Sequence, residues 1–244
     1  MACYSGAEVA FDFQSVRAEG LVRLYGATRA LAGVDLVLEA GRVTALEGPN
    51  GSGKSTLLRL LGLRDRPTRG TLWFGERRAR SSDPAARACI GLLGHESMLL
   101  PELSTWENLR WLARLHGLAR PERRLAELGE RLGLGRWAER PVGTCSRGQR
   151  QRAAIARALL HAPRLLLLDE PATGLDAASV RRLVEVVRAE RARGAIVVLV
   201  SHDPELVDQV ADRRLRLRRG RIEAEAAAAA PAAVPVTEAA EGHS

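Results

Sequence analysis

The chain has 244 residues, of which 46% are apolar and 27% charged, so it can bury a sizeable core in one large domain or in a core with a small subdomain. No apolar run approaches the roughly 20 residues that a membrane-spanning helix needs. The first residues include acids and no basic segment ahead of an apolar block, which argues against a signal peptide. Three scattered cysteines match neither a disulfide framework nor a metal-binding pattern. These features predict a soluble protein of a reducing compartment.

Basic residues outnumber acidic ones by 37 to 29, which gives a net charge of +8. A basic body could suit nucleic acid, anionic lipid headgroups or nucleotides, but a solvated Arg-rich surface explains the charge more simply. A sharper observation is that every basic residue except one is Arg, and the single Lys is Lys54 in the segment GPNGSGKST. A compact ammonium on a flexible stem reaches into a tight phosphate-binding loop where a planar guanidinium is too wide.

Hydrophobic periodicity and turn residues predict strands that alternate with helices. Residues 11–47 are expected to form short strands broken by turns, and residues 90–160 to be mostly helical. Residues 213–222 alternate Arg and Leu, which predicts a terminal hairpin with one solvated face. Individual strands are expected at 34–38, 43–47, 71–74, 165–168 and 195–200, and helices at 54–63, 106–118, 121–132, 146–160 and 177–192.

Several of these strands are apolar on both faces and alternate with helices, which predicts a parallel sheet covered on both sides. The Ala- and Pro-rich segment 223–244 has too few large apolar residues to join a core, so we expect it to be a disordered tail. The folded domain is therefore expected to span residues 11–222.

The segment 48–55 fits the pattern G-x4-G-K-[ST] and lies between a predicted strand and a predicted helix, as a phosphate-binding loop requires. The glycines let successive backbone N–H groups turn toward a β-phosphate, and the helix N-terminus adds its positive end. Lys54 would bridge the β- and γ-phosphates, and the Ser55 hydroxyl would bind Mg²⁺. The expected nucleotide-binding residues are Gly48, Pro49, Asn50, Gly51, Ser52, Gly53, Lys54, Ser55 and Thr56.

A predicted buried strand ends in two acids, Asp169 and Glu170. Asp169 would hold Mg²⁺ at the carboxyl end of the strand, where open α/β sheets bind their ligands. Glu170 would polarise the attacking water. Taken alone, this segment could be a buried strand followed by an ordinary acidic cap, but a neighbouring phosphate-binding loop favours the catalytic interpretation.

The segment Cys145-Ser146-Arg147-Gly148-Gln149 narrows this generic nucleotide site. It resembles the LSGGQ signature of the ATP-binding cassette family, and the resemblance extends over about residues 11–222. It implies an α/β fold with a P-loop NTPase core, in which helices flank a parallel sheet. It also implies a small antiparallel β subdomain and an α-helical insert, about residues 86–150, that carries the signature.

The resemblance assigns roles to three further residues. Tyr25 corresponds to the aromatic residue that stacks on adenine, although it could be a half-buried packing residue. Asp176 corresponds to an acid at the dimer interface, and it would also suit the N-cap of the following helix. His202 corresponds to the switch histidine that contacts the γ-phosphate, with a helix cap as the alternative role.

Cassettes of this family work in pairs, so the resemblance implies a homodimer that sandwiches two ATP molecules. Ser146, Gly148 and Gln149 of one copy would face the phosphate-binding loop of the other. ATP and Mg²⁺ are the expected ligands, and membrane permease subunits are the expected partners. The expected location is the cytoplasmic face of the inner membrane, and no nucleic acid is expected.

Two segments depart from the family pattern. In the signature, Arg147 replaces a glycine and Cys145 replaces a leucine; elsewhere, His95 replaces a glutamine that contacts Mg²⁺ and the attacking water. His95 is therefore a candidate catalytic residue, with a surface histidine of no catalytic part as the alternative. With these departures, segments 93–96 and 146–152 resemble the haem-exporting ATPases of bacterial cytochrome c maturation. That branch implies haem export.

Three alternatives stay open. An ATPase of an exporter for another lipophilic or peptide substrate would share all these motifs. A nucleic-acid-associated cassette ATPase would use the basic surface, but such proteins usually carry long coiled coils or two tandem cassettes. A P-loop phosphotransferase would lack the segment 145–149.

Overall fold

The structure, a computed structural model, describes residues 11–227. The chain begins with a long antiparallel hairpin of β1 (Ser15–Tyr25) and β2 (Thr28–Glu39), which continues through β4 (Arg69–Phe74) and β5 (Arg77–Arg78) into a four-stranded sheet of order β2-β1-β4-β5. The expectation of short strands here is wrong. The strands run through their glycines because register shifts near Gly20 absorb an extra residue without ending the pairing.

The second sheet has six strands in the order β10-β9-β3-β8-β7-β6. All neighbours are parallel except β10 and β9, so the predicted parallel sheet is confirmed. The strands are β3 (Val43–Glu47), β6 (Ile90–Leu93), β7 (Leu165–Asp169), β8 (Ile196–Val200), β9 (Arg213–Arg218) and β10 (Arg221–Ala227).

One strand of this sheet was not predicted, and another crosses an expected boundary. Residues 90–160 are mostly helical as expected, but β6 also lies there. A four-residue segment is too short to show a strand period, so only its pairing with β7 reveals the strand. β10 continues through Ala227, so the expected boundary at residue 222 falls inside a strand whose backbone pairs with β9. The remainder of the expected tail, residues 228–244, lies outside the described residues.

All five predicted helices are present, and those over Pro121–Leu132 and Ala177–Ala192 have the predicted bounds. The helix expected at 106–118 is shorter, because a Ser104–Glu107 capping box sets its start and Gly117 follows its end. No helix among residues 11–227 has the length and apolar character to cross a bilayer. The helices are α1 (Lys54–Leu61), α2 (Pro84–Ala88), α3 (Thr105–Leu115), α4 (Pro121–Leu132), α5 (Arg147–Leu159), α6 (Ala177–Ala192) and α7 (Pro204–Val210).

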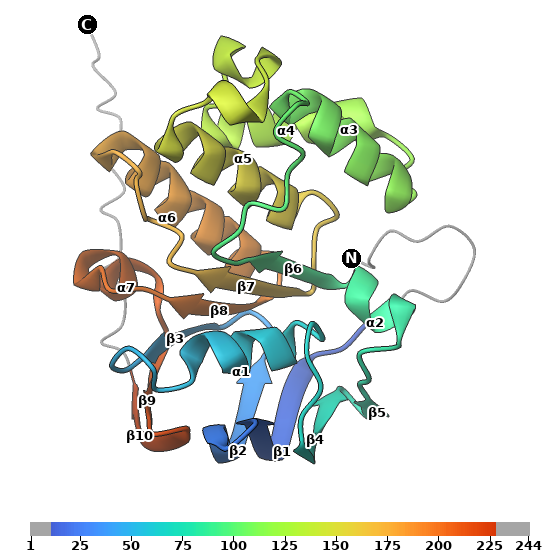
Figure 1. The fold of residues 1–244 in the computed structure, drawn as a ribbon. Coiled ribbons are helices and arrows are strands. Elements are labelled where there is room, and N and C mark those ends of the chain that lie inside the picture. Colours follow the sequence, from blue (N-terminus) through green and yellow to red (C-terminus); the bar gives the residue numbers. More distant parts are fainter. Residues whose placement is uncertain (1–10, 228–244) are drawn as a thin grey trace, which may run out of the picture.

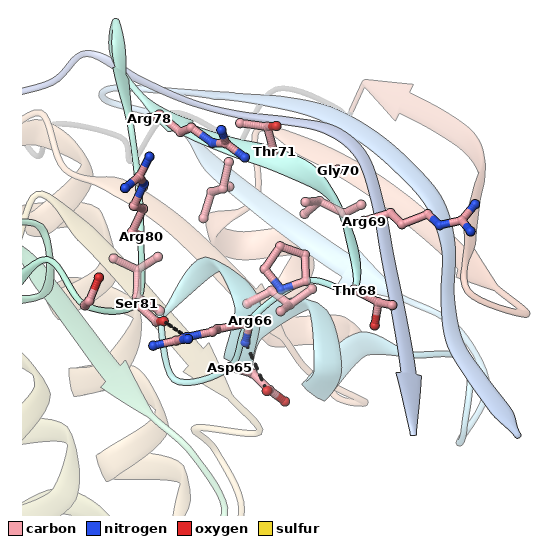
Figure 2. A pocket seen from close by; sticks show the side chains of 16 residues that line it. Asp65, Arg66, Thr68, Arg69, Gly70, Thr71, Arg78, Arg80 and Ser81 are labelled. Carbon is pink, nitrogen blue, oxygen red and sulfur yellow. Dashed lines mark hydrogen bonds between the residues drawn. The ribbon is translucent and has the colours of Figure 1, made fainter. Parts of the chain in front are cut away.

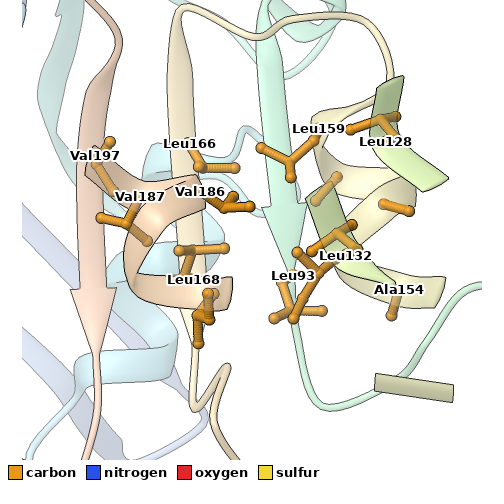
Figure 3. Close-up of a cluster of buried hydrophobic side chains, with 14 of the residues drawn as sticks. Leu93, Leu128, Leu132, Ala154, Leu159, Leu166, Leu168, Val186, Val187 and Val197 are labelled. Carbon is orange, nitrogen blue, oxygen red and sulfur yellow. The ribbon is translucent and has the colours of Figure 1, made fainter. Parts of the chain in front are cut away.

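The six-stranded sheet has α5 and α6 on one face and α1 on the other (Figure 1), and it separates two apolar cores. Alternate residues of β7 point to opposite faces: Leu166 and Leu168 join the core under α4, α5 and α6, whereas Leu165 and Leu167 join the core around α1 and the antiparallel sheet. Figure 3 shows the first of these cores, in which Leu166 of β7, Leu159 of α5 and Val187 of α6 belong to one cluster. The two cores pack against opposite faces of the sheet, and this packing positions the loops that leave the carboxyl ends of β3 and β7.

Candidate functional site

The loop between β3 and α1 has a backbone that only glycine can form. Gly48 and Gly53 have φ values of 143° and 109°. A Cβ atom would lie 2.1 Å from the Leu217 carbonyl oxygen at Gly48, and 2.5 Å from the Ala30 carbonyl oxygen at Gly53. The loop is therefore packed directly against the backbones of β9 and β2, and glycine is required for that approach.

Lys54 turns its side chain back into this loop. Its Nζ donates to the carbonyl oxygens of Gly48, at 2.7 Å, and Pro49, at 3.1 Å, and the residue is only 8% exposed. Lys54 forms no ion pair with any carboxylate of residues 11–227, and the nearby Ser52 Oγ is buried without a hydrogen-bond partner. A buried ammonium without a counter-ion is costly, so the loop chemistry fits an anion such as a phosphate.

Two carboxylates meet two histidines where β7 ends. The Asp169 carboxylate is 6% exposed and lies 3.5 Å from Nε2 of His95. The Glu170 carboxylate lies 3.5 Å from Nε2 of His202 and accepts the His202 backbone N–H at 3.3 Å. The structure therefore brings together the acids and both histidines that the sequence analysis selected.

Glu170 also has a strained backbone. Its φ is +50°, a left-handed conformation that costs a residue with a side chain about 1–3 kcal/mol. Its N–H donates to the Val200 carbonyl at 2.9 Å, which ties the strained residue to β8. The conformation aims the carboxylate at the loop that follows β8, where His202 lies.

The predicted Mg²⁺ site fits the residues present. Mg²⁺ bound with a nucleotide usually takes one or two protein oxygens and leaves the other positions to phosphates and water. Ser55 lies in the first turn of α1, next to Lys54, and the nearly buried Asp169 carboxylate has no hydrogen-bond donor besides His95 in the described part of the chain. Residues 11–227 also hold no cluster of three or more His, Cys, Asp or Glu that would form a complete protein cage.

The signature segment forms the first turn of α5. Ser146 is the N-cap, and its side chain and that of Gln149 form a reciprocal capping box. A Cβ atom at Gly148 would lie 2.6 Å from the carbonyl oxygen of Gly174. A Cβ atom at Gly174 would in turn lie 3.0 Å from Cγ and Cδ of Arg147. Arg147 is accommodated because the facing residue has no side chain.

A cavity of about 330 Å³ connects this turn to the acids, with His95, Arg147, Gln151 and both carboxylate residues in its lining. The sequence analysis did not assign a role to Gln151. Its Nε2 donates to the carbonyl oxygens of Glu170, at 3.2 Å, and Pro171, at 3.0 Å. The only sequence signal for Gln151 is its place one turn into the signature helix.

Tyr25 and Asp176 do not hydrogen-bond to the phosphate-binding loop in the described structure. Tyr25 is 42% exposed, donates its hydroxyl to Asp65 at 2.6 Å and has the Arg23 guanidinium 4.5 Å from its ring centre. Asp176 accepts the N–H of Ser179 at 2.7 Å as the N-cap of α6, and this hydrogen bond lowers its pKa. The N-cap alternative for Asp176 is thus present.

The chain is similar to known proteins in both sequence and fold. The family model described as ABC transporter matches residues 31–173. The chain is 43% identical over 209 residues to the lipoprotein-releasing system ATP-binding protein LolD of Anaeromyxobacter dehalogenans, covering 81% of this chain and 86% of that protein. It is 42% identical over 189 residues to the cytochrome c biogenesis ATP-binding export protein CcmA of Paramagnetospirillum magneticum, covering 76% and 86%.

A third relative, the daunorubicin/doxorubicin resistance ATP-binding protein DrrA of Streptomyces peucetius, is 38% identical, and the match covers 87% of this chain but 65% of that longer protein. A solved dimeric ATP-binding cassette in a post-hydrolysis state, bound to ADP and Pi, superimposes with a TM-score of 0.80 at 28% identity, covering 88% of this chain and 99% of that one. The glycine loop, the paired acids and the signature turn thus occur on a shared fold, and the chain belongs to the ABC transporter family as an ATP-binding subunit.

Proposed function

We propose that the chain is the ATP-hydrolysing subunit of an exporter that moves haem for the maturation of c-type cytochromes. The observation that carries the ATPase part is the buried Lys54 ammonium, which has no carboxylate partner within residues 11–227 and lies in a loop that glycine alone can form. A nucleotide phosphate would supply the missing charge. Fewer observations support haem as the substrate: His95 and Arg147 differ from the usual family residues, and the chain is 42% identical to CcmA.

In this proposal Lys54 and the N–H groups of loop 48–56 bind the phosphates. Glu170 accepts a hydrogen bond from the attacking water, and His202 holds that carboxylate and contacts the γ-phosphate. Bound Mg²⁺, held by Ser55 and Asp169, supplies positive charge that offsets the charge of the phosphates. His95, 3.5 Å from Asp169, positions that carboxylate.

A second copy of the chain would complete each site. Ser146 uses its oxygen as the acceptor in the capping box, so its hydroxyl hydrogen stays available for a γ-phosphate across the dimer. Gly148 and Gln149 lie on the same helix turn, and Asp176 and Tyr25 would contact the partner copy and the adenine. Dimeric cassettes among the solved relatives support this arrangement.

An apolar surface on the helical insert supports docking to membrane subunits at the cytoplasmic face of the inner membrane. Asn108 of α3 binds the backbone of Leu100 through its amide, at 2.8 and 3.0 Å. Leu100 is 46% exposed, and Trp111 and Leu115, further along α3, are 50% and 66% exposed. Large apolar side chains that gather at a protein surface favour a protein partner.

The relatives also support a second candidate. LolD, at 43% identity, and DrrA, at 38%, make an exporter of lipoproteins or of another lipophilic compound the alternative substrate class. Selectivity would then reside in the permease subunits.

The test is a purification of tagged Glu170→Gln protein from native membranes with ATP, with Lys54→Ala as the matched control. Slow hydrolysis should trap the closed dimer on its permease, and the control should retain less. Cytochrome c maturation proteins among the partners, with a loss of c-type cytochromes in a deletion strain, would support haem export. Co-purification of a different permease would be consistent with the ATPase proposal but would overturn the proposal of haem export. Absence of ATP binding by the wild-type protein would overturn both proposals.

A further inference from the structure

A second cavity, of about 790 Å³, lies on the flank of the antiparallel sheet and shares no residue with the phosphate-binding loop. Its sides are the loop 65–68, strand β4 and the segment 78–82, and leucines from β1, α1 and β4 form the apolar part of its lining. Figure 2 shows this cavity, with Arg66, Arg78 and Arg80 around one end and Arg69 at the other.

The four arginines that line the cavity form no ion pair with any carboxylate of residues 11–227. Neighbouring arginines are different, since Arg23 pairs with Asp65 and Arg77 pairs with Asp83, each at 2.7 Å. The one acid in the lining, Asp65, is already engaged by Arg23 and by the Tyr25 hydroxyl. The cavity therefore concentrates positive charge that the described protein does not neutralise.

Arg66 is held in place before any ligand arrives. Its Nε donates to Ser81 Oγ at 2.7 Å, as Figure 2 shows, and its backbone carbonyl accepts from Arg23 at 2.8 Å. Because only Nε is used, both terminal nitrogens of the guanidinium keep their N–H donors. A fixed guanidinium loses less conformational freedom on binding, which favours affinity.

We propose that this cavity binds a phosphate-bearing anion. Guanidinium groups bind phosphate oxygens with paired N–H donors, and several guanidiniums that share one cavity repel each other until an anion lies between them. The cavity volume suits a small ligand, and the leucine side chains in the lining suit the carbon skeleton of a phosphate ester. Two sources share this chemistry, the headgroup of an acidic phospholipid and a soluble phosphate monoester.

The decisive variant is the triple Arg66→Gln, Arg78→Gln, Arg80→Gln. Its matched control is Arg114→Gln, Arg123→Gln, Arg136→Gln, which removes the same charge from exposed arginines of the helical insert that have no ion pair among residues 11–227. Both are placed in a Lys54→Ala background, so that the phosphate-binding loop does not contribute. The probes are vesicles of phosphatidylcholine with phosphatidylglycerol, vesicles of phosphatidylcholine alone, and glycerol 3-phosphate by calorimetry.

We expect the Lys54→Ala protein to bind an anionic probe, and the cavity triple to lower that affinity at least tenfold or so while the control triple retains most of it. Binding to phosphatidylglycerol vesicles alone assigns the lipid source, and binding to glycerol 3-phosphate assigns the soluble one. Ser81→Ala leaves the charge unchanged and should weaken binding severalfold by releasing Arg66. Binding to no probe, or equal losses in the two triples, would overturn the proposal without bearing on ATP hydrolysis.

Discussion

Replacing Gly148 with Ala sets two opposite effects against each other. In an open helix this change stabilises a protein by about 1 kcal/mol, because Ala favours the helix. In α5 the new Cβ would lie 2.6 Å from the Gly174 carbonyl oxygen. A normal C···O contact is about 3.3 Å, so the two backbones would have to separate by roughly 0.7 Å. Overpacking of this kind costs about 1–3 kcal/mol, so we expect a net loss of about 0–2 kcal/mol.

The measurement is urea unfolding of the Gly148→Ala protein beside ATP-dependent dimerisation. Gly129→Ala is the matched control, because that helical glycine faces only the tip of the Trp106 ring, at 2.9 Å, which can shift. The control should be neutral or stabilised and should dimerise normally. Gly148→Ala should dimerise poorly even where it remains folded, since the signature turn has moved. A gain of about 1 kcal/mol with normal dimerisation would refute the reasoning.

Three other outcomes follow from buried or strained residues. Burial keeps His161 neutral and lowers its pKa to about 3, so stability is full above the unfolded value near 6.5 and should fall at lower pH by up to about 1.4 kcal/mol per pH unit. Urea unfolding at two pH values should show this slope, and His161→Phe should lose most of it. Because the φ of Glu170 is +50°, the Glu170→Gly protein should be about 1 kcal/mol more stable than the Glu170→Ala protein in thermal melting, although both should lose ATP hydrolysis. Equal stability of the two variants would contradict backbone strain at this position. Asn108→Leu should cost about 1–3 kcal/mol, because it leaves the Leu100 N–H without its acceptor, whereas the carbonyls of Leu100, Leu103 and Ser104 keep a backbone donor; no loss of stability would count against that bonding.

The sequence analysis succeeded where a local pattern determines the structure. The apolar runs of β7 and β8 are buried on both faces, and the G-x4-G-K-[ST] loop lies between a strand and a helix as predicted. It did not predict structure that depends on pairing with a distant segment. β6 is a strand only because β7 lies beside it, and β10 extends past residue 222 only because β9 offers its edge.

Contacts between loops were also beyond prediction. Arg147 fits because the Gly174 backbone lies close to its side chain, and the spacing of residues in the sequence does not predict that contact. The two bonds from Gln151 to the carbonyls beyond Glu170 likewise arise from the packing of α5 on β7. His95 and His202 were selected through the resemblance to the ATP-binding cassette family, but their pairing with particular acids required the structure.

Lys54 makes the chain unusual as a chemical object. It carries the only side-chain amine among 244 residues, so an acylating reagent that spares the N-terminus has one place to react. A protease specific for lysine likewise has one bond to cut, the bond between Lys54 and Ser55, where α1 begins. Because that amine is 8% exposed and bonded to its own loop, modification or cleavage requires the loop to open. The rate of either reaction therefore reports on the opening of one loop in the whole molecule, without any introduced label.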